Sequence, residues 1–334
     1  MQEAYFGFPG NGVQNAIYFE RKNIDIPENQ WFLNEMNNVA QCDLVGKMFD
    51  KKKRKEITDE KEIQISIVGS SYLLANQLKK KIKCQGTFGL SLGEITAATA
   101  AESIEDPVAA LYLARERAIA MSGCIPKKKI VTIDELCNPE TGKYMAAVTG
   151  LSYRIVNKVC IHVSKKRKYG SVIAANENTP KQVVISGAEE AVERASKIIK
   201  RKWPNSQINS LNTSGPWHNP DYMIYGYTQY MRALDATKFS IPKTKLYLMS
   251  AQDFVSDPVE IKEHLGVQML KPVRFWSGLI NIIKAGYRKL VDVGSGGVLK
   301  KFFENTPEAV VLDKDAILNP DAAEKPAENQ DKKE

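Results

Sequence analysis

Residues 89–93 read Gly89-Leu90-Ser91-Leu92-Gly93, a GxSxG sequence, and the small residues at 94–101 after it predict a helix. Glycine on both sides of the serine permits a sharp turn from strand to helix that exposes the hydroxyl group. The first amides of that helix, at the positive end of its dipole, would lie near an oxyanion formed at Ser91. GxSxG alone consists of common turn residues, so a nucleophilic Ser91 also requires a base.

The chain has three histidines from which a base could come. His218 lies in the segment 211–220, a predicted loop between a strand and a helix, where catalytic groups are common. His162 falls on a predicted amphipathic helix and His264 on a charged segment, so we expect both to be structural or solvated. His218 is therefore the candidate general base.

The composition is that of a soluble globular protein, with 43% hydrophobic and 26% charged residues among 334. No basic segment followed by an apolar run opens the chain, and no apolar stretch approaches the roughly 20 residues that span a bilayer. We expect a cytoplasmic protein without a membrane partner. The five cysteines lack CxxC spacing, which predicts reduced thiols and no metal site; they are Cys42, Cys84, Cys124, Cys137 and Cys160.

The net charge of +8 comes largely from lysine-rich runs at 51–55, 79–83, 127–129 and 165–168. Such runs usually form solvated faces. They carry no interleaved aromatic residues and match no nucleic-acid-binding motif, so no nucleic-acid partner is expected. An acidic protein partner fits the charge equally well.

Hydrophobic patterning predicts alternating strands and helices in the first part of the chain. Residues 4–8 form a predicted strand that enters a glycine-rich turn, and residues 62–69 fit either a strand or the start of a buried helix. Residues 73–81 and 107–120 are helical in pattern, and 86–89 lead into a turn.

After Gly123 the pattern changes to a polar, loop-like stretch at 127–143 and then a β-α-β-β-α succession typical of a ferredoxin-like unit. Its predicted strands and helices lie at 144–148, 152–163, 172–175, 182–186 and 188–202. Further strands at 245–250 and 289–293 and helices at 222–234, 258–265 and 277–285 follow, before a polar tail that begins near residue 320. We expect this tail to be disordered.

Two further features bear on ligand binding. Arg115 or Arg117, both on the predicted helix 107–120, could hold a substrate carboxylate by two parallel hydrogen bonds. The glycine-rich segment 294–297 lacks the GxxxxGK[ST] pattern of a phosphate-binding loop, and a strand-to-helix turn is expected there.

Together these segments resemble the malonyl-CoA:acyl carrier protein transacylases and the acyltransferase domains of polyketide synthases, from residue 4 to about residue 305 and in the family's order. Residues 8–14 are similar to FPGQGSQ, 89–94 to GHSLGE, and 175–187 to AN.NSP.Q.V.SG, which is the longest match. Shorter similarities lie at 117–121 (RGxxM), 145–148, 214–218, 268–276 (QL..PVRW) and 291–296 (EVGPG).

The resemblance implies an α/β fold, with an α/β-hydrolase-like large subdomain and an inserted ferredoxin-like small subdomain. The large subdomain would comprise residues 1–126 and 210–318, and would hold Ser91 and His218. The small subdomain would comprise residues 140–209, and 319–334 would be the tail. A monomer is the expectation for this family.

The resemblance also implies a ping-pong reaction without a bound cofactor, with a coenzyme A thioester as substrate and an acyl carrier protein as partner. Ser91 would attack the thioester with His218 as general base, and Gln268 would orient His218 through its main-chain carbonyl. The amides of Asn11 and Leu92 would form the oxyanion hole. Arg117 would hold the free carboxylate of a malonyl group.

Three positions depart from the family pattern. Asn11 replaces the usual glutamine, which leaves the backbone amide in place. Leu90 replaces the histidine that normally precedes the nucleophile, so the pocket wall beside Ser91 is more apolar. Trp217 stands where phenylalanine or serine is usual, and its bulk favours plain malonyl over a C2-branched acyl group. The same changes could instead mark an unusual extender unit.

Other functions remain compatible with the sequence. A hydrolase that clears acyl groups from carrier proteins would keep the fold and the nucleophile, although Arg117 would serve no purpose on a simple acyl chain. A non-catalytic carrier-binding protein would not need Ser91, His218, Arg117 and Gln268 together. An ordinary α/β-hydrolase esterase explains only GxSxG. Fatty acid synthesis and polyketide synthesis by a discrete, trans-acting enzyme both stay open.

Overall fold

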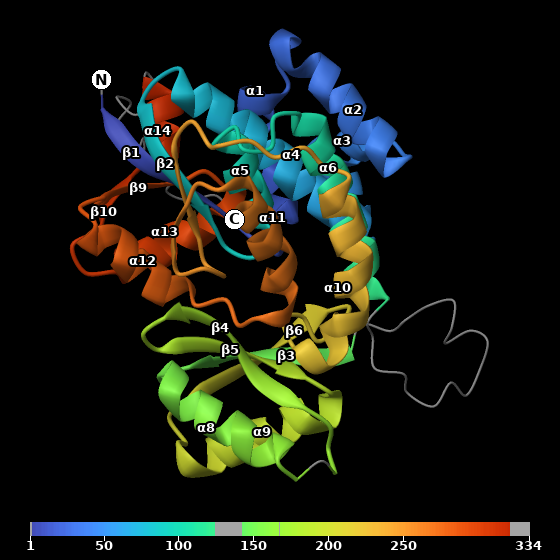
Figure 1. Ribbon diagram of the computed structural model, residues 1–334, viewed down its shortest axis with the longest axis vertical. Coiled ribbons are helices and arrows are strands. Elements are labelled where there is room, and N and C mark those ends of the chain that lie inside the picture. Colours follow the sequence, from blue (N-terminus) through green and yellow to red (C-terminus); the bar gives the residue numbers. More distant parts are fainter. Residues whose placement is uncertain (1, 124–141, 167, 321–334) are drawn as a thin grey trace, which may run out of the picture.

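The computed structural model describes residues 2–123, 142–166 and 168–320 (Figure 1). Most of the predicted loop at 127–143, Cys124, Cys137 and the tail from 321 lie outside the described residues. Two subdomains are present, one built around a six-stranded sheet and one around a four-stranded sheet. In Figure 1 the smaller one, in green and yellow, lies below the larger.

The large sheet has the strand order β10-β9-β1-β2-β7-β8. Its neighbouring strands run parallel except β7 and β8, which are antiparallel. Tyr5, Phe6 and Phe8 of β1 are fully buried, as expected for a central strand of a parallel sheet covered on both faces. The strands are β1 (Glu3–Phe8), β2 (Lys83–Gly89), β7 (Lys245–Leu248), β8 (Asp253–Val255), β9 (Lys289–Asp292) and β10 (Val310–Leu312).

Helices cover both faces of this sheet, and among the described residues none is long and apolar enough to cross a membrane (Figure 1). The α-helices are α1 (Arg21–Ile24), α2 (Gln30–Ala40), α3 (Leu44–Phe49), α4 (Glu60–Lys79), α5 (Gly93–Ala100), α6 (Pro107–Ser122), α10 (Pro220–Asp235), α11 (Pro258–Val267), α12 (Phe275–Lys284), α13 (Val298–Glu304) and α14 (Lys314–Leu318). The 3₁₀ helices are η1 (Gln14–Glu20), η2 (Pro27–Asn29), η3 (Lys53–Glu56), η4 (Gln268–Leu270) and η5 (Ser295–Gly297).

The segment 62–69, left open between strand and helix in the sequence, belongs to α4, which continues through 73–79 as one helix. Asp59 caps its start by accepting a hydrogen bond from the Lys61 amide at 2.8 Å. The small residues in its middle, from Gly69 to Ser71, are buried. Their size allows α4 to pack closely against the neighbouring helix α2, where Met36 lies against Gly69.

The small subdomain consists of β3 (Gly142–Thr149), α8 (Tyr153–Ser164), β4 (Val172–Thr179), β5 (Gln182–Gly187), α9 (Glu189–Lys202) and β6 (Gln207–Thr213). Its antiparallel sheet has the order β4-β5-β3-β6, the ferredoxin-like arrangement. Both helices cover the sheet face that points away from the large subdomain (Figure 1). The expected boundary at residue 209 is too early, because Ser210 and Leu211 pair with β3 and β6 ends only at Thr213.

Main-chain hydrogen bonds join the two subdomains. The Val273 amide donates to the Ala175 carbonyl at 2.7 Å, and the Glu177 amide donates to the Val273 carbonyl at 2.9 Å. An ion pair between Arg274 Nε and Glu177 Oε2 at 2.6 Å lies beside them. These contacts fix β4 against the segment that follows η4, so the small subdomain has a defined position over the large one.

The GxSxG segment links β2 to α5. Residues 86–89, expected to lead into a turn, are the end of β2, and the turn itself is confined to the next three residues. A Cβ atom on Gly89 would overlap the backbone of Gly93 and Glu94, and one on Gly93 would overlap the Phe8 carbonyl. Both glycines are therefore required for α5 to start directly above β1 and β2.

We predict that Gly89→Ala and Gly93→Ala each lower the free energy of unfolding by about 1–3 kcal/mol, since the added methyl group meets backbone that cannot move aside. Urea unfolding monitored by circular dichroism measures the change. Gly123→Ala is the matched control, because a Cβ atom there would meet its nearest atom, the Ile119 carbonyl oxygen, at an ordinary 3.6 Å. Equal stability of all three variants would contradict the packing argument.

Candidate active site

Ser91 lies in the tight turn between β2 and α5, with a backbone φ of 53°. This left-handed conformation is uncommon for a residue with a side chain and costs free energy that the surrounding packing must supply. It turns the Ser91 hydroxyl out of the sheet, toward the space between the two subdomains. The local sequence thus presents the half-buried Ser91 hydroxyl to this space, as the GxSxG pattern predicts.

His218 reaches Ser91 from the loop between β6 and α10. Its Nε2 lies 2.7 Å from Ser91 Oγ, and its Nδ1 lies 3.0 Å from the Gln268 main-chain oxygen. A carbonyl oxygen can only accept, so Nδ1 carries the hydrogen and donates it to Gln268. In the neutral ring Nε2 is then the acceptor for the Ser91 hydroxyl, which is the tautomer that a general base requires.

Burial keeps the His218 ring neutral. Its side chain is 2% exposed. Desolvation, followed by the nearby positive charge of Arg117, lowers the pKa of His218 to about 4, although the hydrogen bond to Gln268 opposes the shift. At neutral pH the ring is therefore in the form that can accept a proton from Ser91.

Of the two arginines that the sequence left open, Arg117 is the one at the site. It projects from α6, is 2% exposed, and its Nη2 donates to Ser91 Oγ at 2.9 Å and to Gln268 Oε1 at 3.2 Å. Its Nη1 donates to Gln64 Oε1 at 3.1 Å. Arg115 instead forms an ion pair with Glu116 at 2.8 Å. A buried guanidinium beside the serine is an anion-binding group.

The side chain of Gln268 connects several parts of the site. Its Nε2 donates to the Ser91 carbonyl at 2.8 Å and to Glu94 Oε2, while its Oε1 accepts from Arg117. Glu94 also accepts a hydrogen bond from the Met249 amide. Complete burial, opposed by these hydrogen bonds, raises the pKa of Glu94 to about 7. Gln268 therefore contacts His218 through its main chain and Ser91, Arg117 and Glu94 through its side chain.

The amides expected to form an oxyanion hole belong to Asn11 and Leu92. Leu92 immediately precedes α5, and Asn11 lies in the turn after β1. Within the part of the chain that the structure describes, neither amide donates a hydrogen bond to another protein group. Both amides are thus available as hydrogen-bond donors beside the turn between β2 and α5 that carries Ser91.

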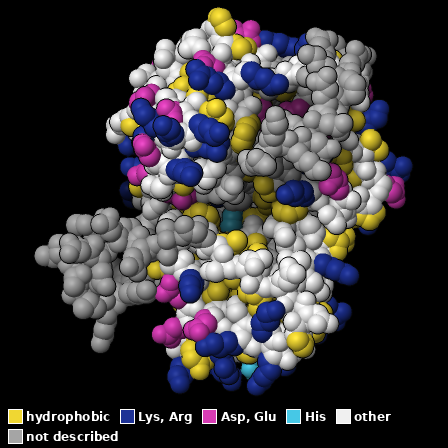
Figure 2. Space-filling model, turned by 180° about the vertical axis from the view of Figure 1, so that it is seen from behind, with side chains coloured by type: hydrophobic (Ala, Val, Ile, Leu, Met, Phe, Trp, Pro, Cys, Tyr) yellow, Lys and Arg dark blue, Asp and Glu magenta, His cyan; other side chains and the backbone are white. Residues whose placement is uncertain are grey.

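One cavity of about 320 Å³ lies between the subdomains, and its lining includes Asn11, Ser91, Arg117 and His218. Leu90 and Trp217, singled out from the sequence, both contribute to its wall, as do Met121, Met145, Val184 and Phe302. Figure 2 shows this side of the molecule, with a hollow between the two lobes, hydrophobic side chains around it and a histidine at depth. The mixture of an apolar wall and a few convergent polar groups is typical of a small-molecule site.

Sequence reasoning assigned no role to Gln64, Glu94 or Glu60, although the structure places all three at or beside this cavity. Gln64 and Glu60 are four residues apart on α4 and therefore lie on one helix face. Their spacing of one helical turn, next to the largely apolar stretch 65–69, was the available signal. Glu94 stands within the quoted GxSxG segment, but burial of its carboxyl group could not be inferred from the pattern.

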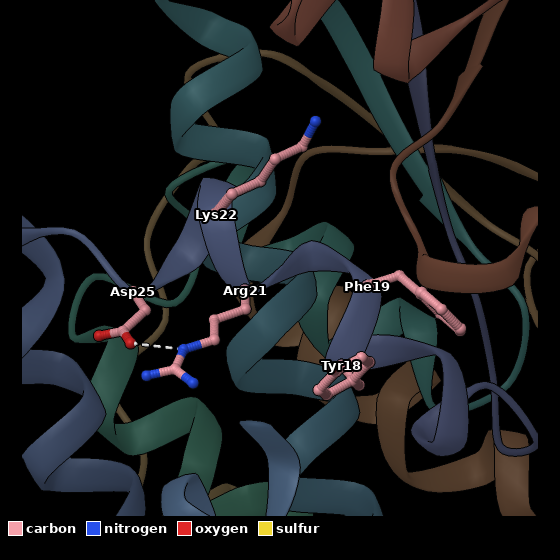
Figure 3. Close-up of a pocket in the computed structure, with 5 residues that line it drawn as sticks. All are labelled: Tyr18, Phe19, Arg21, Lys22 and Asp25. Carbon is pink, nitrogen blue, oxygen red and sulfur yellow. Dashed lines mark hydrogen bonds and ion pairs between the residues drawn. The ribbon is translucent and has the colours of Figure 1, made fainter. Parts of the chain in front are cut away.

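Another hollow, of about 470 Å³, lies on η1 and α1 and is bordered by Tyr18, Phe19, Arg21, Lys22 and Asp25. Arg21 Nε donates to Asp25 Oδ2 at 3.0 Å, whereas Lys22 points away from both (Figure 3). Phe19 is 68% exposed. This open surface feature contains none of the residues predicted to react.

Comparison with known proteins gives a consistent result. No protein-family model matches the chain. A malonyl CoA-acyl carrier protein transacylase of Bacillus subtilis (strain 168) is 26% identical over 323 residues, which is 95% of this chain and 96% of the relative. A crystal structure of an acyl-carrier-protein S-malonyltransferase from Burkholderia pseudomallei 1710b is 26% identical, with a TM-score of 0.82 over 97% of this chain and 100% of that one.

A third similarity concerns the fold alone. A malonyl-transacylase solved in complex with a type II polyketide synthase acyl carrier protein has a TM-score of 0.81 and 23% identity, covering 95% of this chain and 98% of that one. The near-complete coverage in each case includes both sheets and the inserted small subdomain. In its fold, its Ser91–His218 pair and its sequence over nearly the whole length, the chain is similar to the malonyl-CoA:acyl carrier protein transacylases.

Proposed function

We propose that this protein transfers a malonyl group from coenzyme A to the phosphopantetheine thiol of an acyl carrier protein, through an acyl-Ser91 intermediate. The observation that carries the proposal is the buried guanidinium of Arg117, which lies 2.9 Å from the nucleophile. A fixed positive charge at that place selects an acyl group with a second carboxylate. Simple acyl chains offer nothing to pair with it.

In the first half-reaction Ser91 Oγ attacks the thioester carbonyl carbon as His218 Nε2 takes the hydroxyl proton. The Asn11 and Leu92 amides donate to the oxyanion of the tetrahedral intermediate, a contribution of about 3 kcal/mol per donor. Collapse of the intermediate breaks the carbon–sulfur bond. The leaving thiolate takes the proton from His218, which returns to its neutral state.

The second half-reaction repeats these steps in reverse with a new thiol. His218 accepts the proton of the carrier's phosphopantetheine thiol, the sulfur attacks the acyl-serine, and Ser91 leaves with the proton restored. All steps use side chains and amides of the chain, so the proposed reaction needs no bound cofactor. Lysine and arginine side chains are frequent on the face that holds the hollow (Figure 2), which suits an acidic carrier protein.

The competing functions fit the site less well. A hydrolase would have to admit water to the acyl-serine, whereas Leu90, Met121 and Trp217 line this cavity with apolar surface. A non-catalytic carrier-binding protein gives no reason for the strained Ser91 backbone or for the tautomer fixed at His218. We place the enzyme in the cytoplasm, where coenzyme A thioesters are made, in fatty acid or polyketide synthesis.

We predict that malonyl-CoA adds one malonyl group to the wild-type protein, seen as a mass increase in intact-protein mass spectrometry. Ser91→Ala should show no adduct. Arg117→Ala should lose malonyl labelling by at least about 100-fold, as expected when one partner of a buried charge pair is removed.

Arg115→Ala is the matched control, because Arg115 lies on the same helix but pairs with Glu116. It should label like the wild type. An adduct from simple acyl-CoA but not from malonyl-CoA would favour the hydrolase. Absence of an adduct from every thioester tested would favour the non-catalytic carrier-binding protein.

We predict that the acid limb of kcat/KM for malonyl-CoA lies near pH 4, well below the ordinary histidine value of 6.5. Burial lowers the pKa of His218 to about 4, so the base form persists as the pH falls until that value is reached. Initial rates between pH 3.5 and 8 test this, with circular dichroism at each pH to confirm folding. The pKa of Glu94 is also shifted, to about 7, so Glu94→Gln is the control for its contribution. An acid limb near pH 6.5 in both the wild type and Glu94→Gln would contradict the prediction.

A further inference from the structure

Glu60, the first residue of α4, lines the cavity that contains Ser91 and Arg117, yet the proposed mechanism assigns it no role. It is an acidic side chain in a pocket whose other polar groups suit an anionic acyl group. Asn11, where the chain departs from the family's glutamine, donates a hydrogen bond from its Nδ2 to Glu60 Oε1. The two residues therefore form one unit at the mouth of the proposed oxyanion hole.

Hydrogen bonds also connect Glu60 to Arg117. Gln64 Nε2 donates to Glu60 Oε1 at 3.2 Å, and Gln64 Oε1 accepts from Arg117 Nη1 at 3.1 Å. Gln64 thus presents its carbonyl to the cation and its amide group to the carboxylate. Among the described residues no hydrogen bond ends on Glu60 Oε2, so one oxygen of this carboxylate stays available to a bound molecule.

The carboxyl group of Glu60 is poorly solvated. Desolvation raises the pKa of its carboxyl group, while the hydrogen bonds from Gln64 and Asn11 and the charge of Arg117 oppose that shift. The ionisable groups around Glu60 and Arg117 are His218 across the cavity, Asp59 beside Glu60 and Glu94 on α5, whose charge also acts on Arg117. His218 is neutral over most of the pH range, and Glu60 is the acid of this group that lines the cavity itself.

We propose that Glu60 determines acyl-group specificity: its carboxylate offsets part of the charge of Arg117 and so reduces the preference of this pocket for carboxylate-bearing acyl groups over neutral ones. This inference rests on the proposed function. With Glu60 ionised, Arg117 and Glu60 together are neutral, and a malonyl carboxylate brings a net negative charge into the cavity. A neutral acyl group brings none, and a hydroxyl substituent on it could donate to Glu60 Oε2.

The test compares Glu60→Gln with the wild type, because glutamine keeps an oxygen that can accept from both Asn11 and Gln64 while it removes the charge. Acylation rates of Ser91 are measured with malonyl-CoA and with acetyl-CoA. We expect the malonyl-to-acetyl ratio of kcat/KM to rise about threefold to tenfold, the size of effect for one unit charge in a partly solvated pocket. The change should lie in KM for malonyl-CoA, with kcat for both donors nearly unchanged.

Two further variants separate charge from structure. Glu60→Ala also removes the acceptor for Gln64 and Asn11, so it should lower kcat for both donors. Glu62→Gln removes a carboxylate of the same helix that pairs with Lys47 at 2.8 Å, outside the cavity, and should leave the ratio unchanged.

The pH dependence gives an independent measurement. As the pH rises, Glu60 ionises, and the malonyl-to-acetyl ratio of the wild type should fall. The ratio of Glu60→Gln should fall less, because only Glu94 then still ionises near Arg117. The ratio cancels the effect of His218 on both donors. An unchanged ratio in Glu60→Gln, with Ser91 still malonylated, would overturn this inference alone. Absence of any acyl-Ser91 in the wild type would overturn the proposed function itself.

Discussion

The site depends on a single hydrogen bond, between Ser91 and His218, whose residues are 127 positions apart in the chain. Ser91 is fixed by the tight turn between β2 and α5, and His218 is fixed by the loop between β6 of the small subdomain and α10. Both residues have positive φ angles, 53° and 64°. Two strained residues are held in contact because the large sheet and the docked small sheet each define one side of the cavity.

The buried positive charge of Arg117 is compensated by the groups around it. Arg117 is nearly inaccessible to solvent, and such a cation is tolerated only when hydrogen bonds and opposite charges surround it. Gln64 and Gln268 accept from its guanidinium, and Glu60 and Glu94 supply negative charge nearby. The anion-binding capacity of the pocket is therefore a property of this whole group of α4, α5 and α6 side chains, and not of the arginine alone.

Local sequence patterns were sufficient to predict the elbow and the small subdomain. The need for glycine at positions 89 and 93 in a tight turn can be inferred from the sequence. The alternating strand and helix segments predicted after Gly123 match the observed elements. The pattern failed where burial is uniform: along α4, apolar and small residues occur on all sides, and a helix and a strand look alike. The end of β6 was missed because its polar residues pair with β3 only in the folded chain.

The contacts of Glu60, Gln64 and Glu94 could not be predicted for a different reason. Each depends on which helix faces which across the cavity, and side chains that meet there come from segments up to 174 residues apart, as for Gln268 and Glu94. Periodicity places a residue on a helix face but does not identify what lies opposite. Resemblance to the family is sufficient to predict Ser91, His218, Arg117 and Gln268 as site residues, whereas the positions of Glu60 and Glu94 follow only from the three-dimensional fold.

The partner of His218 Nδ1 is a main-chain carbonyl, not a carboxylate side chain. The hydrogen bond that orients His218 is therefore insensitive to substitution at position 268. A substitution can remove the amide side chain but cannot remove the main-chain oxygen. The use of a main-chain partner also means that the group bound to Nδ1 does not itself titrate. Evolution could therefore vary the side chain at position 268 to retune the Arg117 and Ser91 contacts while the tautomer of the base stays constant.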